Sequence, residues 1–429
     1  MRTLFTEEQL ADRPTARSEK ILRSCVHCGF CQATCPTYAL TGDELDSPRG
    51  RIYLIKDMLE NDRPADAKTV KHIDRCLSCL ACVTTCPSDV DYMHLVDHAR
   101  SYIEKSYKRP LFDRVLRSML ARVLPNRGLF EASMRAAMLT RPLHGLLRGR
   151  LAALAKAAPK AMPKPSTLDA PGVKPARGAR RLRVLLLAGC VQRSLEPEIN
   201  AATIRLLTRF GVEVIVAEGA GCCGALAHHL GREEDAIAAV KRNVDAWCEA
   251  AADGPIDAII ANASGCGTML KDYGHVLADD DEYAEKAERI ATLAKDVSEI
   301  LLNLDLAFPE RATGLTVAYH SACSMQHGQK ITAAPKALLE AAGFGVVEPA
   351  ESHMCCGSAG AYSFLQPEMA GRLRERKARA LEKTEPDVVA SGNVGCITHL
   401  RPGLSTDILH TVQLLDWASG GPDPRRKPE

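Results

Sequence analysis

Through the second half of the chain, short continuous apolar runs alternate with longer stretches whose apolar residues recur at spacings of three and four. The short runs predict buried parallel strands, and the longer stretches predict helices. Strands are predicted at residues 182–188, 212–217 and 256–261, with helices at 201–210 and 235–251. The same order returns with strands at 315–319, 345–347 and 388–390 and helices at 336–342 and 368–381. This alternation predicts right-handed βαβ units and parallel sheets.

The first hundred residues follow a helical pattern instead. From Ser47-Pro48 to Leu59, apolar residues recur three and four positions apart, which predicts a helix that begins at the Ser-Pro pair. Residues 94–108 predict another helix. A small, mostly helical domain is therefore expected to end near residue 110.

Residues 111–160 are strongly basic. They contain ten Lys or Arg against only Asp113 and Glu131. A basic amphipathic stretch can lie on an anionic membrane or on an acidic partner, whereas the plainer interpretation is a solvated helical face. Five prolines between residues 159 and 175 then predict an interdomain linker.

These changes of pattern divide the chain into parts. We expect a helical domain at 1–110, a basic helical segment with a Pro-rich linker at 111–181, and two α/β domains at 182–312 and 313–429. The length of 429 residues agrees with two or three domains. The expected fold class is α+β multidomain, with a mostly helical N-terminal domain before two duplicated α/β domains that contain parallel sheets.

Eight of the seventeen cysteines lie in two runs within the first domain. Each run has the spacing C-x2-C-x2-C-x3-C-P, which is typical of cubane 4Fe-4S clusters. The first three thiolates of such a run surround one cluster, and the fourth serves the other cluster. Crossed ligation is therefore predicted, with one cluster held by Cys25, Cys28, Cys31 and Cys86 and the second by Cys76, Cys79, Cys82 and Cys35. Two clusters this close predict an electron carrier.

Zinc sites and a disulfide framework are the alternatives for these runs. A zinc site has no use for a fourth cysteine repeated with the same Cys-Pro ending in each run. Disulfides are disfavoured because residues 1–17 lack the apolar core of a secretory signal. Thiol-rich chains in a reducing compartment usually bind metal, so the expected location is the cytoplasm.

A second set of cysteines reveals an internal duplication. Cys190, Cys222, Cys223 and Cys266 recur as Cys323, Cys355, Cys356 and Cys396. In both copies 31 residues separate the first cysteine from the adjacent pair. Each of these cysteines follows a predicted strand, and the carboxyl ends of parallel strands meet at one edge of a sheet. Four thiols are therefore expected to converge in each copy.

Four thiols at one site suit either a third type of iron-sulfur cluster or a tetrahedral zinc ion. The adjacent Cys-Cys pair is awkward for a regular cubane and favours an unusual cluster or another metal, while buried core thiols are the alternative. His353 and His399 flank these cysteines in the second copy. They could be metal ligands or proton carriers, but the favoured interpretation is that they lie outside the ligand set or on the surface. Cys248 lies outside every group and is expected to be a small buried apolar residue.

Composition and motifs argue against several other classes of protein. A net charge of +2 and 4% aromatic residues argue against nucleic-acid binding, and no apolar run approaches the ~18 residues that span a bilayer. Gly219-Ala-Gly221-Cys-Cys-Gly224 matches a dinucleotide-binding pattern, but its counterpart at residues 352–357 keeps only Cys-Cys-Gly, which indicates an accidental match. No other flavin or nicotinamide pattern, P-loop or Ser-His-Asp pattern stands out, so substrate chemistry is expected elsewhere.

With two cluster runs before duplicated Cys-Cys-Gly units, the chain resembles the family that joins a ferredoxin-type domain to two cysteine-rich CCG domains. Within that family it is similar to the iron-sulfur subunits of bacterial glycolate oxidases over essentially its whole length. The resemblance rests on the first cysteine run and on Gly42-Asp-Glu-Leu-Asp46, Pro48-Arg-Gly-Arg-Ile-Tyr53, Ala263-Ser-Gly-Cys-Gly267 and Ser352-His-Met-Cys-Cys-Gly-Ser-Ala-Gly360.

The resemblance implies a non-flavin subunit of an oxidoreductase complex, with no catalytic residues of its own for the substrate. FAD-containing partner subunits would oxidise glycolate, or D-lactate, and electrons would cross this chain to a membrane quinone or another acceptor. The implied location is the cytoplasm, at the inner face of the cell membrane. Equivalent subunits of anaerobic glycerol-3-phosphate dehydrogenase and of lactate-utilisation systems are the alternatives.

A thiol-disulfide reductase similar to heterodisulfide reductase is a further alternative. The CCG units of that family end in C-x-x-C, whereas here the ends are Cys266-Gly-Thr-Met269 and Cys396-Ile-Thr-His399, so each repeat lacks one thiolate. A metal-bound assembly scaffold without redox activity is the last alternative. The expected cofactors are two 4Fe-4S clusters, with a further iron-sulfur cluster or zinc in each CCG domain.

Overall fold

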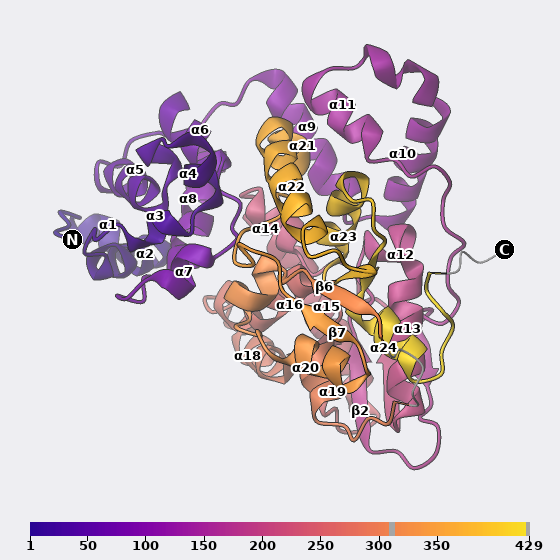
Figure 1. Ribbon diagram of the computed structural model, residues 1–429. Helices are drawn as coiled ribbons and strands as arrows, with labels where there is room; N and C mark the ends of the chain where they lie inside the picture. The colour runs from indigo at the N-terminus through magenta and orange to yellow at the C-terminus, as the bar shows by residue number, and fades with distance from the viewer. Residues whose placement is uncertain (309–313, 426–429) are drawn as a thin grey trace.

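The computed structural model describes residues 1–308 and 314–425. Its N-terminal domain, at the left of Figure 1, consists of short helices, as the periodicity predicts. These elements are α1 (Glu7–Ala11), α2 (Arg13–Ser24), α3 (Phe30–Ala33), α4 (Pro36–Thr41), the 3-10 turn η1 (Glu44–Asp46), α5 (Pro48–Glu60), α6 (Ala67–Asp74), α7 (Ala81–Thr85) and α8 (Tyr92–Ser106). The predicted helix at Ser47 is α5, and the Ser47 hydroxyl caps it by accepting a hydrogen bond from the Gly50 amide at 3.1 Å.

The core of this domain comes from the apolar faces of α2, α5, α6 and α8. Leu22, Ile55, Ile73 and Leu95, one from each helix, are completely buried in one cluster. Burial of each such side chain stabilises the fold by ~1.5–3 kcal/mol. This core supports the two cysteine runs, which lie between α2 and α4 and between α6 and the start of α8.

Each repeat copy contains one sheet. The first copy has β1 (Gly172–Lys174), β2 (Leu182–Leu186), β3 (Val212–Val216), β4 (Ala258–Ala261) and β5 (Ala294–Asp296), and the second has β6 (Thr316–Tyr319), β7 (Gly345–Val347), β8 (Val388–Ser391) and β9 (Ile408–His410). The strand orders are β1-β3-β2-β4-β5 and β7-β6-β8-β9. From β2 to β5 and from β6 to β9 all neighbours are parallel. The copies therefore share one topology, as the duplicated cysteines predict.

The sheets depart from the prediction in two places. β1 lies in the stretch expected to be a linker and pairs antiparallel with β3, so the first sheet is mixed rather than parallel. β5 and β9 are missing from the predicted strands. Each has only three residues, and its identity as a strand comes from pairing with β4 or β8, which a local pattern does not reveal.

Helices surround both sheets. In the first copy they are α12 (Gln192–Leu195), α13 (Pro197–Arg209), α14 (Ala225–His229), α15 (Glu233–Ala252), α16 (Ser264–Lys271), α17 (Tyr273–Val276), α18 (Ala284–Leu293) and α19 (Val297–Leu302). In the second copy they are the π-helical turn η3 (Ser324–Gly328), α20 (Ala334–Ala341), α21 (Tyr362–Leu365), α22 (Pro367–Glu382), α23 (Val394–Leu400), the 3-10 turn η4 (Arg401–Gly403) and α24 (Thr411–Ala418). The prediction for Cys248 is wrong, because this side chain is exposed on α15 while its neighbour Trp247 occupies the buried position.

The two copies share one hydrophobic core. α13, which follows β2, packs against α24, which follows β9. In the same way α20, which follows β6, packs against α19, which follows β5. Leu206 and Leu414 are buried in this core, and the buried carboxylate of Asp416 accepts a hydrogen bond from Arg205 at 2.8 Å across it. This reciprocal packing relates the copies by approximate twofold symmetry.

The basic segment is helical, with α9 (Leu111–Val123), α10 (Arg127–Leu139), the 3-10 turn η2 (Arg141–Leu146) and α11 (Gly149–Lys156). It lies beside α21 and α22, at the top of Figure 1. Two of its arginines are paired with a carboxylate of the same segment, because Asp113 accepts hydrogen bonds from Arg117 at 3.1 Å and from Arg150 at 2.6 Å. Within the described ranges, no helix combines the length and apolar character needed to cross a membrane.

The helical domain is attached to both repeat copies. His94 Nε2 lies 2.9 Å from the carboxylate of Asp272 in the first copy. Burial alone would lower the pKa of His94, but hydrogen bonds with Asp272 and Asp91 raise it to about 10, which makes this contact an ion pair at neutral pH. On the second copy, Arg372 donates to the carbonyl of Leu40 at 2.8 Å. These contacts hold the cysteine runs against the repeats.

Candidate iron-sulfur and thiol sites

Both cysteine runs have the same backbone conformation. In the first run His27 (φ 57°) and Gly29 (φ 86°) flank the second cysteine, and in the second run Ser78 (φ 48°) and Leu80 (φ 62°) do so. The left-handed region costs a residue such as Leu80 ~1–2 kcal/mol. Strained backbone of this kind persists where the surroundings over-determine it, as at ligand sites. The repeated conformation indicates that both loops are shaped around a bound group.

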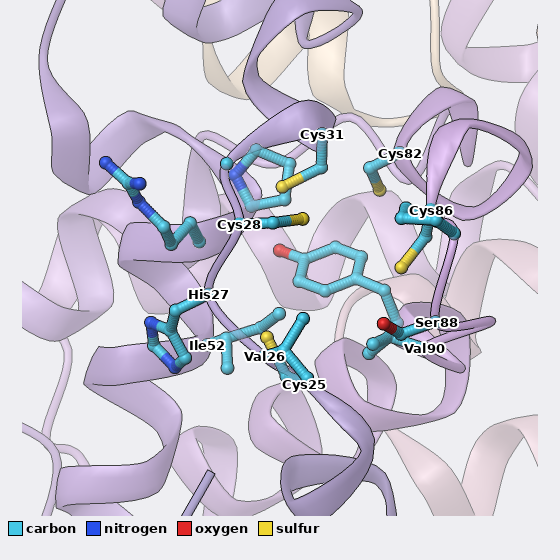
Figure 2. Close-up of a pocket in the computed structure, with 15 residues that line it drawn as sticks. Cys25, Val26, His27, Cys28, Cys31, Ile52, Cys82, Cys86, Ser88 and Val90 are labelled. Carbon is cyan, nitrogen blue, oxygen red and sulfur yellow. The ribbon is translucent and has the colours of Figure 1, made fainter.

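The first group of thiols lines a pocket between the two runs. Figure 2 shows the cysteines around it, which are Cys25, Cys28, Cys31, Cys86 and Cys82. The pocket encloses about 430 Å³ and is partly open to solvent. Burial raises the pKa of Cys31 to about 11, and negative charge on Cys25, Cys35 and Cys86 adds to this shift. Several thiolates therefore crowd one small space.

The second group of thiols lies deeper. Cys76, Cys79, Cys82 and Cys35 are all buried. Burial raises the pKa of Cys82 well above its usual value, and negative charge on Cys76, Cys35 and Cys31 raises it further. Cys35 thus lies with the second run and Cys86 with the first. Crossed ligation requires this arrangement, while the assignment of individual ligands stays a prediction.

The residues at both groups fit an iron-sulfur cluster. Each group offers cysteine sulfur as its donors, the first in a pocket partly open to solvent and the second in a buried place, and cysteine thiolates are the usual ligands of 4Fe-4S clusters. Bound iron would offset the repulsion between the thiolates. When bound, 4Fe-4S clusters supply one-electron oxidation and reduction.

A buried cation, Arg51 of the Pro48–Tyr53 motif, lies beside the second group. It donates to the carbonyl of His72 at 2.7 Å and to the hydroxyl of Thr37 at 2.9 Å, and its Nη1 lies 3.9 Å from Cys35 Sγ. Burial opposes the charged guanidinium, but negative charge, first on Cys76, raises the pKa of Arg51 above its usual value. Arg51 therefore places a permanent positive charge next to these thiolates.

In the second repeat copy the four thiols lie close together. Cys323 Sγ is 3.6 Å from Cys355 Sγ, and Cys356 Sγ is 3.5 Å from Cys396 Sγ. The hydrogen bond to Cys355 and burial raise the pKa of Cys323 well above its usual value. Lys377 is also buried here; burial lowers its pKa, and negative charge on Cys356 and Cys355 opposes that shift. The convergence expected from the repeat is present.

The first copy brings together Cys190, Cys222, Cys223 and Cys266. Hydrogen bonds from Cys190 and Cys223 lower the pKa of Cys222. Asn243 holds the adjacent pair by accepting from the Gly221 amide at 2.8 Å and donating to the carbonyl of Cys222 at 2.9 Å. The Gly221 amide therefore serves the thiol loop rather than a phosphate, in agreement with an accidental match to the dinucleotide pattern.

Each Cys-Cys pair is followed by a glycine, and steric crowding explains why glycine is needed there. Gly224 and Gly357 have φ values of 93° and 94°. A Cβ atom at Gly357 would lie 2.8 Å from the carbonyl oxygen of Ala370 in α22. Only glycine combines this conformation with so close an approach to the helix.

The histidines near the cysteines of the second repeat lie in different surroundings. His353 and His399 belong to no group of donors close enough to hold a metal among the described residues. The ring of His399 lies 3.2 Å from the carbonyl of Ala370 instead. His320 does belong to such a group, although the sequence reasoning overlooked it. Burial lowers the pKa of His320 to about 3, and the charge of Lys377 adds to that shift, so this imidazole is neutral.

The second cysteine run touches the thiols of the second copy. Leu77 and Cys79 share an apolar cluster with Cys355 and Tyr362, and Cys323 packs against it. Burial raises the pKa of Cys79 well above its usual value, and negative charge on Cys323 is the next largest cause. Within the described parts of the chain, that cluster contains no cysteine of the first copy. The thiols of the second copy therefore share an apolar cluster with the second cysteine run of the helical domain.

Known proteins resemble this chain along its whole length. Residues 21–90 match the 4Fe-4S dicluster domain, and residues 184–271 and 317–401 each match the cysteine-rich CCG domain. The glycolate oxidase iron-sulfur subunit of Escherichia coli is 42% identical over 419 residues, which cover 97% of this chain and 99% of that relative. The chain belongs to the family of glycolate oxidase iron-sulfur subunits.

Other relatives of this iron-sulfur subunit are more distant. The probable glycolate oxidase iron-sulfur subunit of Bacillus subtilis is 32% identical, covering 93% of this chain and 94% of the relative. Lactate utilization protein A of Bacillus licheniformis is 26% identical over 55% of this chain and 99% of its own length. A hypothetical protein from Helicobacter pylori shares the fold, with a TM-score of 0.55 and 10% identity over 97% of this chain and 74% of that one.

Arg51 is expected to tune a cluster bound in this iron-sulfur subunit. Replacing it by Met removes a positive charge that favours the reduced, more negative state. A unit charge at ~4 Å is worth about 4 kcal/mol at an effective dielectric constant of ~20, so we expect Arg51→Met to lower the midpoint potential of a one-electron cluster by roughly 170 mV. An EPR-monitored redox titration of the anaerobic protein measures it.

Arg51→Lys is the matched control, because it keeps the charge and should shift the potential by less than half as much. Asp46 lies 3.6 Å from Arg51 Nη2 and loses this ion pair in Arg51→Met, but it keeps Arg75 at 2.8 Å, so its buried carboxylate retains a cationic partner. Equal midpoint potentials in the wild type and Arg51→Met would contradict the role given to this charge.

Proposed function

We propose that this chain is the electron-transfer subunit of a glycolate-oxidising complex, which receives electrons from FAD-containing partner subunits and delivers them to a quinone or another acceptor. The observation that carries this proposal is the contact of the second cysteine run, at Cys79, with Cys355 and Cys323 of the second repeat. Thiols of the helical domain and of a repeat thus form one continuous path. The role assigned by name to the Escherichia coli relative supports the same function.

We assign the cluster ligands in the crossed manner. One set is Cys25, Cys28, Cys31 and Cys86, and the other is Cys76, Cys79, Cys82 and Cys35. In each CCG domain the metal ligands are Cys190, Cys222, Cys223 and Cys266, or Cys323, Cys355, Cys356 and Cys396. The lining of the first pocket, which includes Cys25, Cys28, Cys31 and Cys86, and the negative charge of Cys35 near Cys79 and Cys82 support the crossed sets.

The flavin-bearing partner is proposed to dock over the first thiol group. Cys28 is exposed there, and Val26, Phe30 and Tyr53 are each at least 62% exposed around it. Exposed apolar side chains gathered at one place are typical of protein interfaces. This face is also the one from which a bound cluster is accessible, so electrons enter the chain there.

Lactate oxidation is the second candidate function. It is favoured by the similarity to lactate utilization protein A, which covers nearly the whole of that relative but only 55% of this chain. The full-length match to the glycolate oxidase subunits favours glycolate. The two functions share the path through the clusters and differ in the flavin partner.

Electron entry can be tested with the complex of this chain and its co-purifying flavin subunits. Anaerobic glycolate should reduce the clusters of the complex within the turnover time, whereas the chain alone should not oxidise glycolate with a dye acceptor. Phe30→Glu should slow cluster reduction at least about tenfold without slowing flavin reduction, because a charge at a docking interface weakens association. Stopped-flow absorbance separates the two steps.

Val173→Glu, at an apolar position on β1 that is 53% exposed and away from the cysteine runs, is the control and should behave as wild type. Glycolate oxidation by the isolated chain would overturn the proposal. Cluster reduction by D-lactate or glycerol 3-phosphate, but not by glycolate, would assign the chain to one of the alternative complexes.

Crossed ligation is tested by serine substitution. Cys28→Ser and Cys79→Ser identify which EPR signal belongs to which cluster. Each of these cysteines lies in the middle of one run, so each substitution should alter the signal of one cluster only. If ligation is crossed, Cys86→Ser alters the signal marked by Cys28→Ser, and Cys35→Ser alters the one marked by Cys79→Ser. Cys248→Ser, at the exposed cysteine of α15, should alter neither. The opposite pairing would refute the crossed sets.

We also propose that α9 attaches the complex to the inner face of the cell membrane. Leu111, Phe112, Val115 and Met119 are each at least 42% exposed along this helix. Arg114 and Arg122 are exposed on the same helix. Exposed apolar side chains beside basic ones suit an anionic lipid surface, where each basic residue contributes ~1 kcal/mol.

Membrane attachment is measured by co-sedimentation with vesicles. The wild type should bind vesicles with 30% phosphatidylglycerol, bind neutral vesicles weakly, and lose the anionic binding at about 0.5 M salt as charges are screened. Val115→Glu should reduce binding several-fold, while Leu302→Glu on α19 should not. Absence of binding to anionic vesicles would exclude this attachment.

A further inference from the structure

The thiol group of the second repeat contains an imidazole that the cysteine spacing does not predict. His320 directly follows β6 and is 1% exposed. One of its ring nitrogens, Cys356 Sγ and Cys396 Sγ all lie within 4.8 Å of one another. These three donors come from the end of β6, the loop after β7 and α23. Three separate elements therefore bring metal-binding atoms to one buried point.

Neither ring nitrogen of His320 has a hydrogen-bond partner among the described residues. An unpaired buried polar group costs ~1–3 kcal/mol, and such groups are rare in native proteins. A metal ion would accept the lone pair of the imidazole and at the same time offset the charge of the two thiolates. Imidazole and thiolate are both common ligands of zinc and of iron.

The first repeat copy lacks this imidazole. The residue three positions before its first cysteine is Leu187, whereas His320 stands three positions before Cys323. Leu187 packs in an apolar cluster with Val244 and Trp247. The two copies thus keep the same four cysteines, but only the second adds a nitrogen donor at this position. The additional donor occurs in the copy whose thiols adjoin Cys79.

We propose that His320 is a metal ligand, which with Cys356 and Cys396 forms a mixed imidazole-thiolate centre that the first copy does not have. The metal is thiophilic, either zinc or the iron of an iron-sulfur cluster, since both accept this donor set. Cys355 and Cys323 adjoin the centre and lie against Cys79 of the helical domain. A redox role of the centre rests on the proposed electron-transfer function, whereas its ligand set does not.

The full chain, labelled with 15N-histidine and purified anaerobically, provides the first test. Iron, sulfide and zinc analysis counts the metal beyond the two cubanes. The zinc-edge X-ray absorption should show a nitrogen neighbour if the metal is zinc, and pulsed EPR should show 15N coupling to an iron-sulfur signal if it is iron. Either result supports the proposal. Absence of additional metal, or coordination by sulfur alone, overturns it.

Variants assign the nitrogen to His320. His320→Leu, which copies the first repeat, should lower the content of this centre at least about tenfold and abolish the nitrogen signature, with the cubane EPR signals unchanged. His320→Cys supplies another ligand and should retain the metal without the nitrogen signature. His399→Leu, at a half-buried histidine of α23 that faces a carbonyl instead, should retain both.

Unchanged metal and an unchanged nitrogen signature in His320→Leu would overturn the proposal, as would the same loss in His399→Leu. If His320→Leu also loses the cubane signals, it has not folded, and the wild-type nitrogen measurement together with His320→Cys decides. If the proposed function is wrong, the flavin subunits will fail to reduce the clusters. That result is independent of whether His320 binds a metal.

Discussion

Repulsion between buried sulfur atoms is the constraint around which this chain is organised. Cys31, Cys79, Cys82 and Cys323 all lie where burial and like charge raise the pKa of the thiol. A raised pKa keeps a buried thiol protonated, so these cysteines become thiolates only where nearby positive charge offsets the cost. Part of that charge is supplied by the chain itself, through Arg51 and Lys377, and iron or another metal would supply the rest. Folding of these loops is therefore coupled to metal binding.

The arrangement of the domains turns these groups into a path. Twofold-related packing of α13 on α24 and of α19 on α20 joins the repeats through one shared core, and contacts such as His94 with Asp272 set the helical domain against them. In that position the second cysteine run shares an apolar cluster with the thiols of the second repeat. Symmetry between the repeats is thus broken by the helical domain.

Two duplicated sites have accordingly diverged in their surroundings. In the first repeat, Asn243 holds the cysteine loop, and an apolar cluster that includes Leu187 fills the space beside it. In the second repeat, a buried lysine and a buried histidine accompany the same four cysteines. The first repeat also anchors the helical domain through Asp272, a task that needs no access to the clusters. Duplication preserved the thiol geometry while the neighbouring residues acquired different roles.

The sequence by itself determined the features that depend on local spacing. Cysteine intervals and the Ser47 helix start are short-range patterns, and they correctly predicted the helical domain and the duplicated α/β topology; the antiparallel β1 and the short β5 and β9 needed pairing partners far away in the chain. Exposure of Cys248 depended on which side of α15 faces the core. Only the tertiary structure decided that Arg51 lies beside Cys35, that His320 joins Cys356 and Cys396, and that Cys79 meets the second repeat. Arg51 and Cys35 are 16 residues apart and the other neighbours are farther apart in the chain, so packing within and between the domains, rather than any local pattern, brings them together.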